Sequence, residues 1–90
     1  MNEIVIKQLS EEEIKQRQIK LWPIWEKEES EFPWEYKATE SCLIIEGEVI
    51  VTTEDGQLFE IKAGDFVTFP KGLKCNWKVL SYIRKYYQFT

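Results

Sequence analysis

The residues of this chain that could do chemistry are limited first by an absence, because the sequence contains no histidine. Without histidine there is no Ser-His or Cys-His nucleophile pair, no histidine general base and no histidine-ligated metal site. Two thiols are present, Cys42 and Cys75, but they lie far apart and make no C-x-x-C pair, so they form no zinc signature. We expect both to be reduced and buried, as small hydrophobic side chains rather than a disulfide.

Two further clusters, one acidic and one of aromatic and basic residues, could be taken for binding sites. The stretch EKEESE at 26–31 could be taken for a hard-cation site. Calcium loops place acids on alternate positions around a glycine turn, and this stretch has neither, so a solvated face is the better interpretation. The run YIRKYY at 82–87 sets aromatic residues around bases, as single-strand binders do, but the acidic chain favours a plain edge strand.

Length and charge narrow the class of protein. Ninety residues predict one domain, spanning 1–90. Residues 1–48 hold twelve acidic against six basic side chains, no basic stripe exists, and the isoelectric point is near 4.9, so we expect no nucleic-acid partner. The apolar runs are too short to span a bilayer, and no apolar signal-peptide core follows Met1. We therefore expect no membrane partner and a cytoplasmic location.

The N-terminal third carries mixed signals. EIVIK at 3–7 alternates β-branched residues and predicts a short strand. SEEE at 10–13 is a capping box, and the helix that it begins is predicted to run to about Leu21 and to stop before Pro23. The tryptophan-rich segment LWPIWEKEESEFPWEY at 21–36 has no clean period, so we interpret it as a plug over one face of a sheet. The side chains expected to face inward there are Trp22, Ile24, Trp25 and Phe32.

From about Glu35 onward the pattern is β-rich. Turn signals recur about every 8–12 residues, which is typical of a sandwich or barrel. Asp55-Gly56 between two apolar runs predicts a two-residue type I′ hairpin, which needs positive φ at both central positions. Gly47 and Gly64 are expected to make tight turns between strands. The expected strands are 42–46, 48–54, 57–62, 66–69, 74–80 and 82–89.

The turn residues also carry a family resemblance. Gly64, Pro70 and Gly72 fit the spacing of the motif G-x5-P-x-G-x2-H-x3-N, and Cys75 stands at the place of its histidine. The asparagine that closes the motif is replaced by Val79. This is the second of the two motifs that mark the cupins.

The first cupin motif, G-x5-H-x-H-x3-4-E-x6-G, is matched at its end by Glu40 and Gly47. Counting back from Glu40 puts Trp34 and Tyr36 on its two histidine positions. Over residues 34–80 the chain thus resembles the cupins, and more narrowly the small single-domain cupins of the DUF861-type subgroup related to ureidoglycine aminohydrolase.

The resemblance implies a fold class and a division of the chain. The implied class is all-β, a cupin-type antiparallel β-barrel or jelly roll with one short N-terminal helix. The implied parts are an N-terminal strand, helix and tryptophan-rich segment at 1–33, a motif core at 34–80 and a C-terminal strand at 82–89.

The chain lacks the motif histidines, and this bears on whether it binds a metal. In metal-binding cupins three histidines and the motif glutamate hold a divalent ion, and only Glu40 matches that set here. Trp34 cannot coordinate, Tyr36 is a poor ligand, and Cys75 could serve as a thiolate. A catalytic zinc site needs about three protein ligands, so we predict no metal cofactor. A divalent metal stays an alternative that would need ligands from outside the two motifs.

The resemblance also implies a site, since both cupin motifs line one cavity. Its members would be Trp34, Tyr36, Glu40, Cys75 and Trp77. Two interpretations stay open. The residues could form an aromatic-walled pocket for a small molecule, with a carboxylate and a thiol at its base. Alternatively, the tryptophans could fill the space left by a lost metal.

Glu40 and Cys75 are the reactive candidates. A carboxylate inside a small barrel must be hydrogen-bonded or protonated, and we expect Tyr36 or Lys74 to be the partner of Glu40. Glu40 is then the best candidate for a general acid or base, unless it is a satisfied strand residue. Cys75 could be activated only by a nearby lysine, Lys74 or Lys78, and is otherwise a buried hydrophobic residue.

Three functions follow as hypotheses. The leading one is a small-molecule binder, for an organic acid or a sugar, with an aromatic-lined barrel and no histidine-ligated metal. The second is an enzyme of the ureidoglycine aminohydrolase or isomerase type that uses Glu40, with or without a metal. The third is an interaction module, a homodimer formed through an edge strand or the tryptophan-rich segment.

Overall fold

The computed structural model describes residues 3–90 and consists mainly of one seven-stranded antiparallel sheet. The predicted all-β class with one short N-terminal helix is confirmed. In chain order the elements are β1 (Val5–Gln8), α1 (Glu11–Gln16), the 3-10 turn η1 (Ile19–Leu21), β2 (Ile24–Lys27), β3 (Ser30–Glu35), β4 (Glu40–Thr53), β5 (Leu58–Lys62), β6 (Asp65–Phe69) and β7 (Lys74–Phe89).

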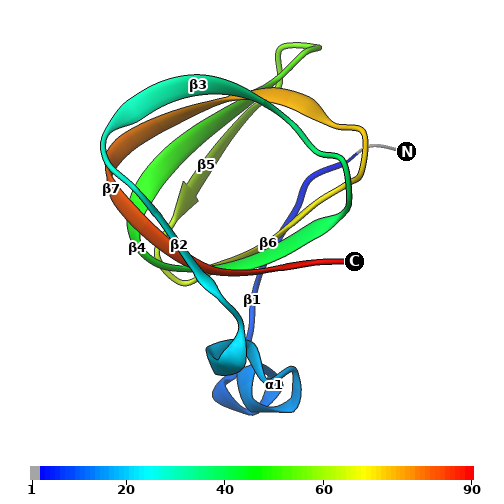
Figure 1. Ribbon diagram of the computed structural model, residues 1–90, viewed down its shortest axis with the longest axis vertical. Coiled ribbons are helices and arrows are strands. Elements are labelled where there is room, and N and C mark those ends of the chain that lie inside the picture. The colour runs from blue at the N-terminus through cyan, green and yellow to red at the C-terminus, as the bar shows by residue number, and fades with distance from the viewer. Residues whose placement is uncertain (1–2) are drawn as a thin grey trace.

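Two long strands, β4 and β7, form the centre of the sheet and pair with each other. Each changes its second neighbour along its length: β4 pairs first with β6 and then with β5, and β7 pairs first with β3 and then with β2. The path β1-β6-β4-β7-β2 is open at both ends among the strands described. Figure 1 shows the sheet curling round, so that β3, β7, β4 and β6 surround a common interior.

Gly47 does not end a strand, as the sequence had suggested, but lies within the continuous β4. The pairing of β4 with β7 slips in register between Ile44 and Val49, so the glycine marks a bulge. Its φ is +98°, and a Cβ there would collide with the carbonyl oxygen of Tyr82 on β7. Because the pairing of β4 with β7 continues on both sides of the bulge, the predicted strands 42–46 and 48–54 are one element, and so are the predicted strands 74–80 and 82–89.

The hairpin between β4 and β5 is present, but its predicted type I′ turn is wrong. Gly56 has a φ of +88°, whereas Asp55 is not among the residues with positive φ. The Gly56 N–H donates to the Thr53 carbonyl (3.0 Å), and the Thr53 N–H donates to the Gln57 carbonyl (2.9 Å). A type I turn followed by one left-handed glycine explains this pattern, because only the last loop residue then needs positive φ.

The N-terminal helix is shorter than the sequence predicted. The capping box is confirmed: Glu13 N–H donates to Ser10 Oγ, and Ser10 N–H donates to Glu13 Oε1. The helix nevertheless ends at Gln16, because Gln18 adopts a left-handed conformation with φ +55° and begins the separate turn η1. No helix within residues 3–90 is long and apolar enough to cross a membrane.

The tryptophan-rich segment is not an irregular plug, since it forms β2 and β3, both paired with β7. Pro33 is tolerated because, among the strands of residues 3–90, β3 pairs with β7 alone and needs no second ladder of hydrogen bonds. Trp25 and Phe32 pack against the core as expected, whereas Ile24 remains 43% exposed. Trp22 instead packs against Phe66, 6.5 Å between ring centroids.

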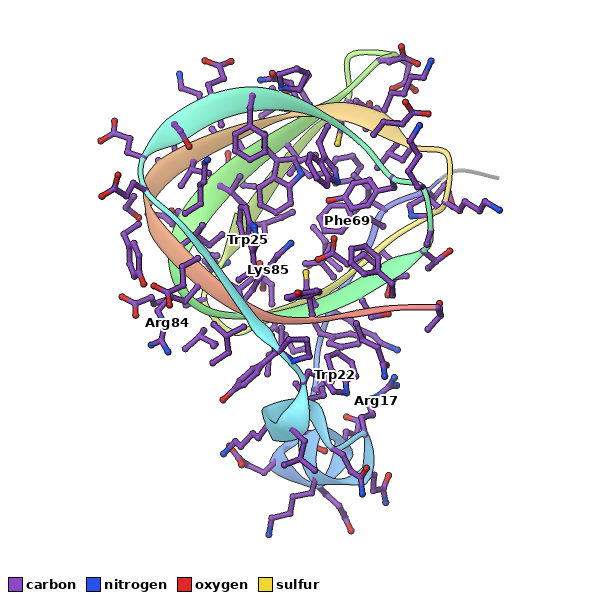
Figure 2. The ribbon with its side chains drawn as sticks, viewed as in Figure 1. Arg17, Trp22, Trp25, Phe69, Arg84 and Lys85 are labelled. Carbon is purple, nitrogen blue, oxygen red and sulfur yellow. The ribbon has the colours of Figure 1, made fainter. Side chains whose placement is uncertain are left out.

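The apolar core fills the inside of the curled sheet (Figure 2). Its buried members are Ile4, Tyr36, Cys42, Ile44, Val49, Val51, Ile61, Val67, Phe69, Leu73, Cys75, Trp77, Val79 and Ile83. Residues 75, 77, 79, 83 and 85 of β7 are all buried, so alternate positions of this strand supply one wall of the interior.

Candidate functional site

A cavity of about 240 Å³ remains inside the curled sheet. Its wall is almost entirely aromatic, with one acidic and one basic side chain. The lining residues are Trp25, Phe32, Trp34, Tyr36, Glu40, Trp77, Lys85, Tyr87 and Phe89. They come from β2, β3, β4 and β7 and from the connection between β3 and β4.

Strand pairing places the wall residues. In the pairing of β2 with β7, Trp25 lies opposite Lys85, and in the pairing of β3 with β7, Phe32 lies opposite Trp77. Cross-strand partners on one face have neighbouring side chains. The rings therefore meet: Trp77 and Phe32 are stacked with centroids 6.2 Å apart, and Trp25 meets Trp77 edge-on at 5.9 Å.

Tyr36 is held by the turn at Pro70–Gly72. The Gly72 N–H donates to the Tyr36 carbonyl (2.7 Å), and the Tyr36 N–H donates to the Leu73 carbonyl (2.9 Å). The Tyr36 ring stacks on Phe69 at 4.8 Å, and its hydroxyl accepts from Trp77 Nε1 at 3.2 Å. Burial, with the Glu40 carboxylate nearby, raises the pKa of the phenol far above its usual range, so it stays neutral.

The charged centre of the cavity is a buried ion pair. Lys85 Nζ lies 2.6 Å from Glu40 Oε2, and the side chains are only 6% and 4% exposed. The ammonium also lies over two indole rings, 4.6 Å from the centroid of Trp77 and 4.8 Å from that of Trp25. Both rings attract the cation, since their faces are electron-rich. Figure 2 shows Lys85 and Trp25 together inside the curl.

Register explains how the two charges meet. Lys85 pairs with Ile44, four residues after Glu40 in β4, so Glu40 and Ile44 face the same side. The long lysine side chain reaches back along the strand to the carboxylate. Holding two such charges away from water costs several kcal/mol per ion. A pair of apolar residues of similar volume at these positions often makes a protein equally stable or more stable. The pair is therefore weak evidence for stability.

Lys85 is the charged residue of the cavity wall that is not among the site residues predicted from the sequence. We expected Tyr36 or Lys74 to be the partner of Glu40, and both expectations are wrong: Lys74 is exposed, and the hydroxyl of Tyr36 bonds to Trp77. A signal was available in the alternation of β7, where a lysine occupies an inward position between Ile83 and Tyr87. Lysine at a position of that kind is rare unless it is paired.

Most of the predicted site residues do come together. Tyr36, Glu40 and Trp77 are buried and line the cavity, and Trp34, 48% exposed, lies at its mouth. Cys75 is buried opposite Trp34 but lines a neighbouring groove instead of the cavity. The aromatic residues that sequence analysis did not assign to the site are Trp25, Phe32, Tyr87 and Phe89.

The two thiols are not poised for reaction. Burial raises the pKa of Cys75 to about 11 and that of Cys42 to about 12. A hydrogen bond with Trp77 opposes the rise in the pKa of Cys75, and the charge of Lys85 opposes the rise in the pKa of Cys42, but burial outweighs both. Both cysteines are free, and at neutral pH both are protonated and poor nucleophiles.

The residues present do not fit a metal ion. The Glu40 carboxylate, the one motif ligand that the chain keeps, is directed at an ammonium group, which competes with a cation for the same oxygen. Nowhere in residues 3–90 do three His, Cys, Asp or Glu side chains gather in a way that could hold a metal.

Comparison with known proteins identifies relatives of this chain. The family model of the EutQ-like cupin domain matches residues 14–87. A crystal structure of a DUF861 family protein from Thermotoga maritima is 52% identical, with a TM-score of 0.96, and the alignment covers 98% of this chain and 100% of that one. No curated protein matches the chain.

Two more distant structures extend the comparison. A DUF861 family protein of unknown function from Pseudomonas syringae pv. tomato is 31% identical over 74% of this chain and 29% of that one, with a TM-score of 0.68. The Clostridium difficile EutQ protein is 22% identical over 93% of this chain and 64% of that one, with a TM-score of 0.66. The last likeness concerns the fold alone.

Proposed function

This chain belongs to the EutQ-like cupin family, and we propose that it binds a small organic molecule in the aromatic-walled cavity, without a histidine-ligated metal. The observation that carries the proposal is the buried Lys85–Glu40 ion pair at the wall of that cavity. A mostly apolar pocket with a few convergent polar groups is the usual profile of a small-molecule site.

The cavity favours one kind of ligand. Its space of about 240 Å³ lies below the roughly 300–1,000 Å³ that drug-sized ligands occupy. The indole and phenyl faces of Trp25, Phe32 and Trp77 suit a flat apolar body. The ammonium of Lys85 can donate to a ligand oxygen, and Glu40 can accept from a ligand donor, so a single polar group on the ligand suffices for orientation.

The competing interpretation, that tryptophans merely fill the interior, accounts for only part of the wall. Trp77 is 2% exposed and is indeed packed between other rings, as a core residue would be. Trp34 and Phe89, however, are 48% and 50% exposed, and both line the same cavity. Two half-exposed aromatic side chains around an opening suit ligand entry better than core packing.

The test is a binding screen with small aromatic probes that differ in their polar group: benzyl alcohol, benzamide and benzoate. A probe present at 100 times its Kd adds about 2.7 kcal/mol to the free energy of unfolding, which a thermal melt detects. Amide chemical shifts should change near Trp25, Trp77 and Lys85 and stay constant near Leu58, an exposed residue of β5. Absence of any shift, or shifts on the outer face alone, would contradict the proposal.

A homodimer is a second proposal, compatible with the first. Among the described strands β5 pairs with β4 alone, and its Leu58 is 61% exposed. An unpaired strand edge with an exposed apolar side chain is a template for pairing with a second copy. Sedimentation should show a dimer that Leu58→Lys weakens, whereas a monomer at every concentration would exclude it.

A further inference from the structure

We propose that Lys85 is a covalent site for carbonyl compounds: its ε-amine forms a Schiff base with an aldehyde or ketone held in the cavity, and Glu40 carries the proton. The inference rests on the proposed function, because the carbonyl compound has to occupy the cavity before it can react. It assigns Lys85 and Glu40 a chemical step in addition to binding.

Lys85 is set apart from every other lysine in the chain. The sequence has nine more lysines, and all of them are exposed, whereas Lys85 is 5% exposed. Its side chain lines the cavity in which a ligand would lie. A carbonyl compound in the cavity therefore meets one amine, held at a defined place between Trp25 and Trp77.

A lysine must lose a proton before it can act as a nucleophile, and the ion pair provides the acceptor. Lys85 Nζ and Glu40 Oε2 are 2.6 Å apart, a distance that one proton can cross directly. The transfer leaves a neutral amine and a neutral carboxyl, which relieves the cost of keeping two charges away from water. A lysine amine that has given up its proton is the nucleophile that forms Schiff bases with carbonyl compounds.

The reaction then balances without any further reagent. Nζ attacks the carbonyl carbon, a C–N bond forms, the oxygen receives a proton from the nitrogen, and a neutral carbinolamine results. The Glu40 carboxyl protonates the hydroxyl group, which leaves as water, while the nitrogen lone pair forms the C=N bond. The sum is ammonium plus carbonyl giving iminium plus water, and Glu40 ends as the carboxylate that it was.

The site is also suited to the product. The iminium nitrogen carries the same positive charge as the ammonium that it replaces, so the carboxylate of Glu40 and the rings of Trp25 and Trp77 still face a cation. The aromatic wall accepts an apolar substituent on the carbonyl carbon. The chemical class that fits is a small aldehyde or ketone with a flat apolar body.

The experiment traps the Schiff base with benzaldehyde and sodium borohydride. Intact-mass measurement should show one benzyl group per chain, and peptide mapping should place it on Lys85. Lys85→Arg keeps the positive charge but is not a nucleophile under these conditions, so it should abolish the label. Glu40→Gln removes the proton carrier and should slow labelling by about 100-fold, the scale of general acid–base catalysis.

A competition on the unaltered protein covers the case in which these variants do not fold. Benzyl alcohol has the size of benzaldehyde but no carbonyl group, so it should protect Lys85 and leave any labelling of the nine exposed lysines unchanged. Labelling spread evenly over the exposed lysines, with Lys85 unmodified, overturns the inference.

The same experiment separates the two proposals. If benzyl alcohol shifts the amides around the cavity and Lys85 is never trapped, the Schiff base is excluded and the binding function stands. If benzyl alcohol does not bind and Lys85 is not trapped, both proposals fail together. Trapping of Lys85 that benzyl alcohol blocks supports both.

Discussion

Arg84 and Lys85 are neighbours in β7, and each faces a glutamate of β4, yet they lie on opposite sides of the sheet (Figure 2). On the outer side Arg84 Nη1 is 3.4 Å from Glu46 Oε1, with side chains 35% and 53% exposed. On the inner side Lys85 Nζ is 2.6 Å from Glu40 Oε2, with both side chains buried. Two ion pairs, each of a basic side chain with a glutamate, thus differ in exposure although their basic residues are adjacent in one strand.

The difference shows what burial does to a pair of charges. The outer pair is surrounded by water, which screens it, and exposed pairs contribute about 0–1 kcal/mol. The inner pair has lost its hydration and is held by a short contact and two indole faces. Removing one partner of such a pair lowers the free energy of unfolding strongly. Replacing both partners by apolar residues of similar volume often changes it little or raises it. The inner pair lines the aromatic-walled cavity of about 240 Å³.

The largest expected effect comes from breaking the inner pair. Glu40→Gln leaves the Lys85 ammonium buried without a counter-charge, which should lower the free energy of unfolding by about 3–5 kcal/mol. Urea denaturation followed by tryptophan fluorescence measures this value. The control is the double variant Glu40→Leu with Lys85→Met, which removes both charges and should be within about 1 kcal/mol of the original or more stable.

A loss below about 1 kcal/mol for Glu40→Gln would mean that the inner pair behaves like an exposed one. The contrast between the two sides of the sheet would then be wrong, and the buried pair would no longer support a ligand in the cavity.

The next effect concerns the bulge at Gly47, after which the inward-facing positions of β4 change from even to odd residue numbers, so that Glu46 faces outward. Gly47→Ala adds a Cβ at φ +98° against the Tyr82 carbonyl oxygen. Strained φ values alone cost about 1–3 kcal/mol, and the collision adds to this. Thermal unfolding should show the loss. Gly56→Ala is the matched control, since it has a similar φ of +88° but open space around it, so the difference between the two variants isolates the close approach of β4 to β7.

A third effect is a loss of stability at alkaline pH, which buried thiols cause and exposed thiols do not. Burial raises the pKa of Cys75 to about 11 and that of Cys42 to about 12, from an ordinary value of 9.0. Above pH 9 the unfolded chain therefore releases protons that the folded protein retains, so stability falls as pH rises. It should be unaffected by these groups below that pH.

Denaturation midpoints between pH 8 and pH 11 check this expectation, and Cys75→Ala should reduce the slope. A slope unchanged by the substitution would show that Cys75 titrates in the folded state as an exposed thiol does, with a pKa near its ordinary value.

The smallest effect is expected from the outer pair. Glu46→Gln removes the partner of Arg84 while both positions stay hydrated, so unfolding free energy should change by less than about 1 kcal/mol, and less still at high salt. Denaturation at low and high salt measures it. Probe binding in the cavity should not change. A loss comparable with that of Glu40→Gln would erase the distinction between the two sides.

Several features were predictable because short-range physics decides them. The capping box of Ser10 and Glu13 closes within one helical turn, and Gly56 marks a hairpin whose exact turn type was missed. The end of the helix was missed because it depends on contacts with the rest of the protein. Helix α1 buries no residue of its own, and the chain leaves it at the left-handed Gln18, after which Ile19 is buried. β2 and β3 were missed because prolines and tryptophans mask the period of edge strands.

The candidate site divides in the same way. Trp34, Tyr36 and Glu40 could be located by motif spacing, since turn residues hold their places at fixed distances along the chain. Trp25 and Lys85 could not, because they join the site through pairing with or within β7 and not through any spacing in the sequence. Cys75 keeps the motif position but lines a different groove from the one expected.

By itself, the sequence determined the all-β class, the family and most of the turns, because glycine at positive φ and a capped helix start depend on neighbours a few residues away. Only the tertiary structure decided that Glu40 meets Lys85, 45 residues further along. That contact depends on the register of β4 with β7, in which Ile44 lies opposite Lys85 and Glu40 opposite Phe89. Because side chains alternate along a strand, a slip of one residue would have put Arg84 inside and Lys85 in water.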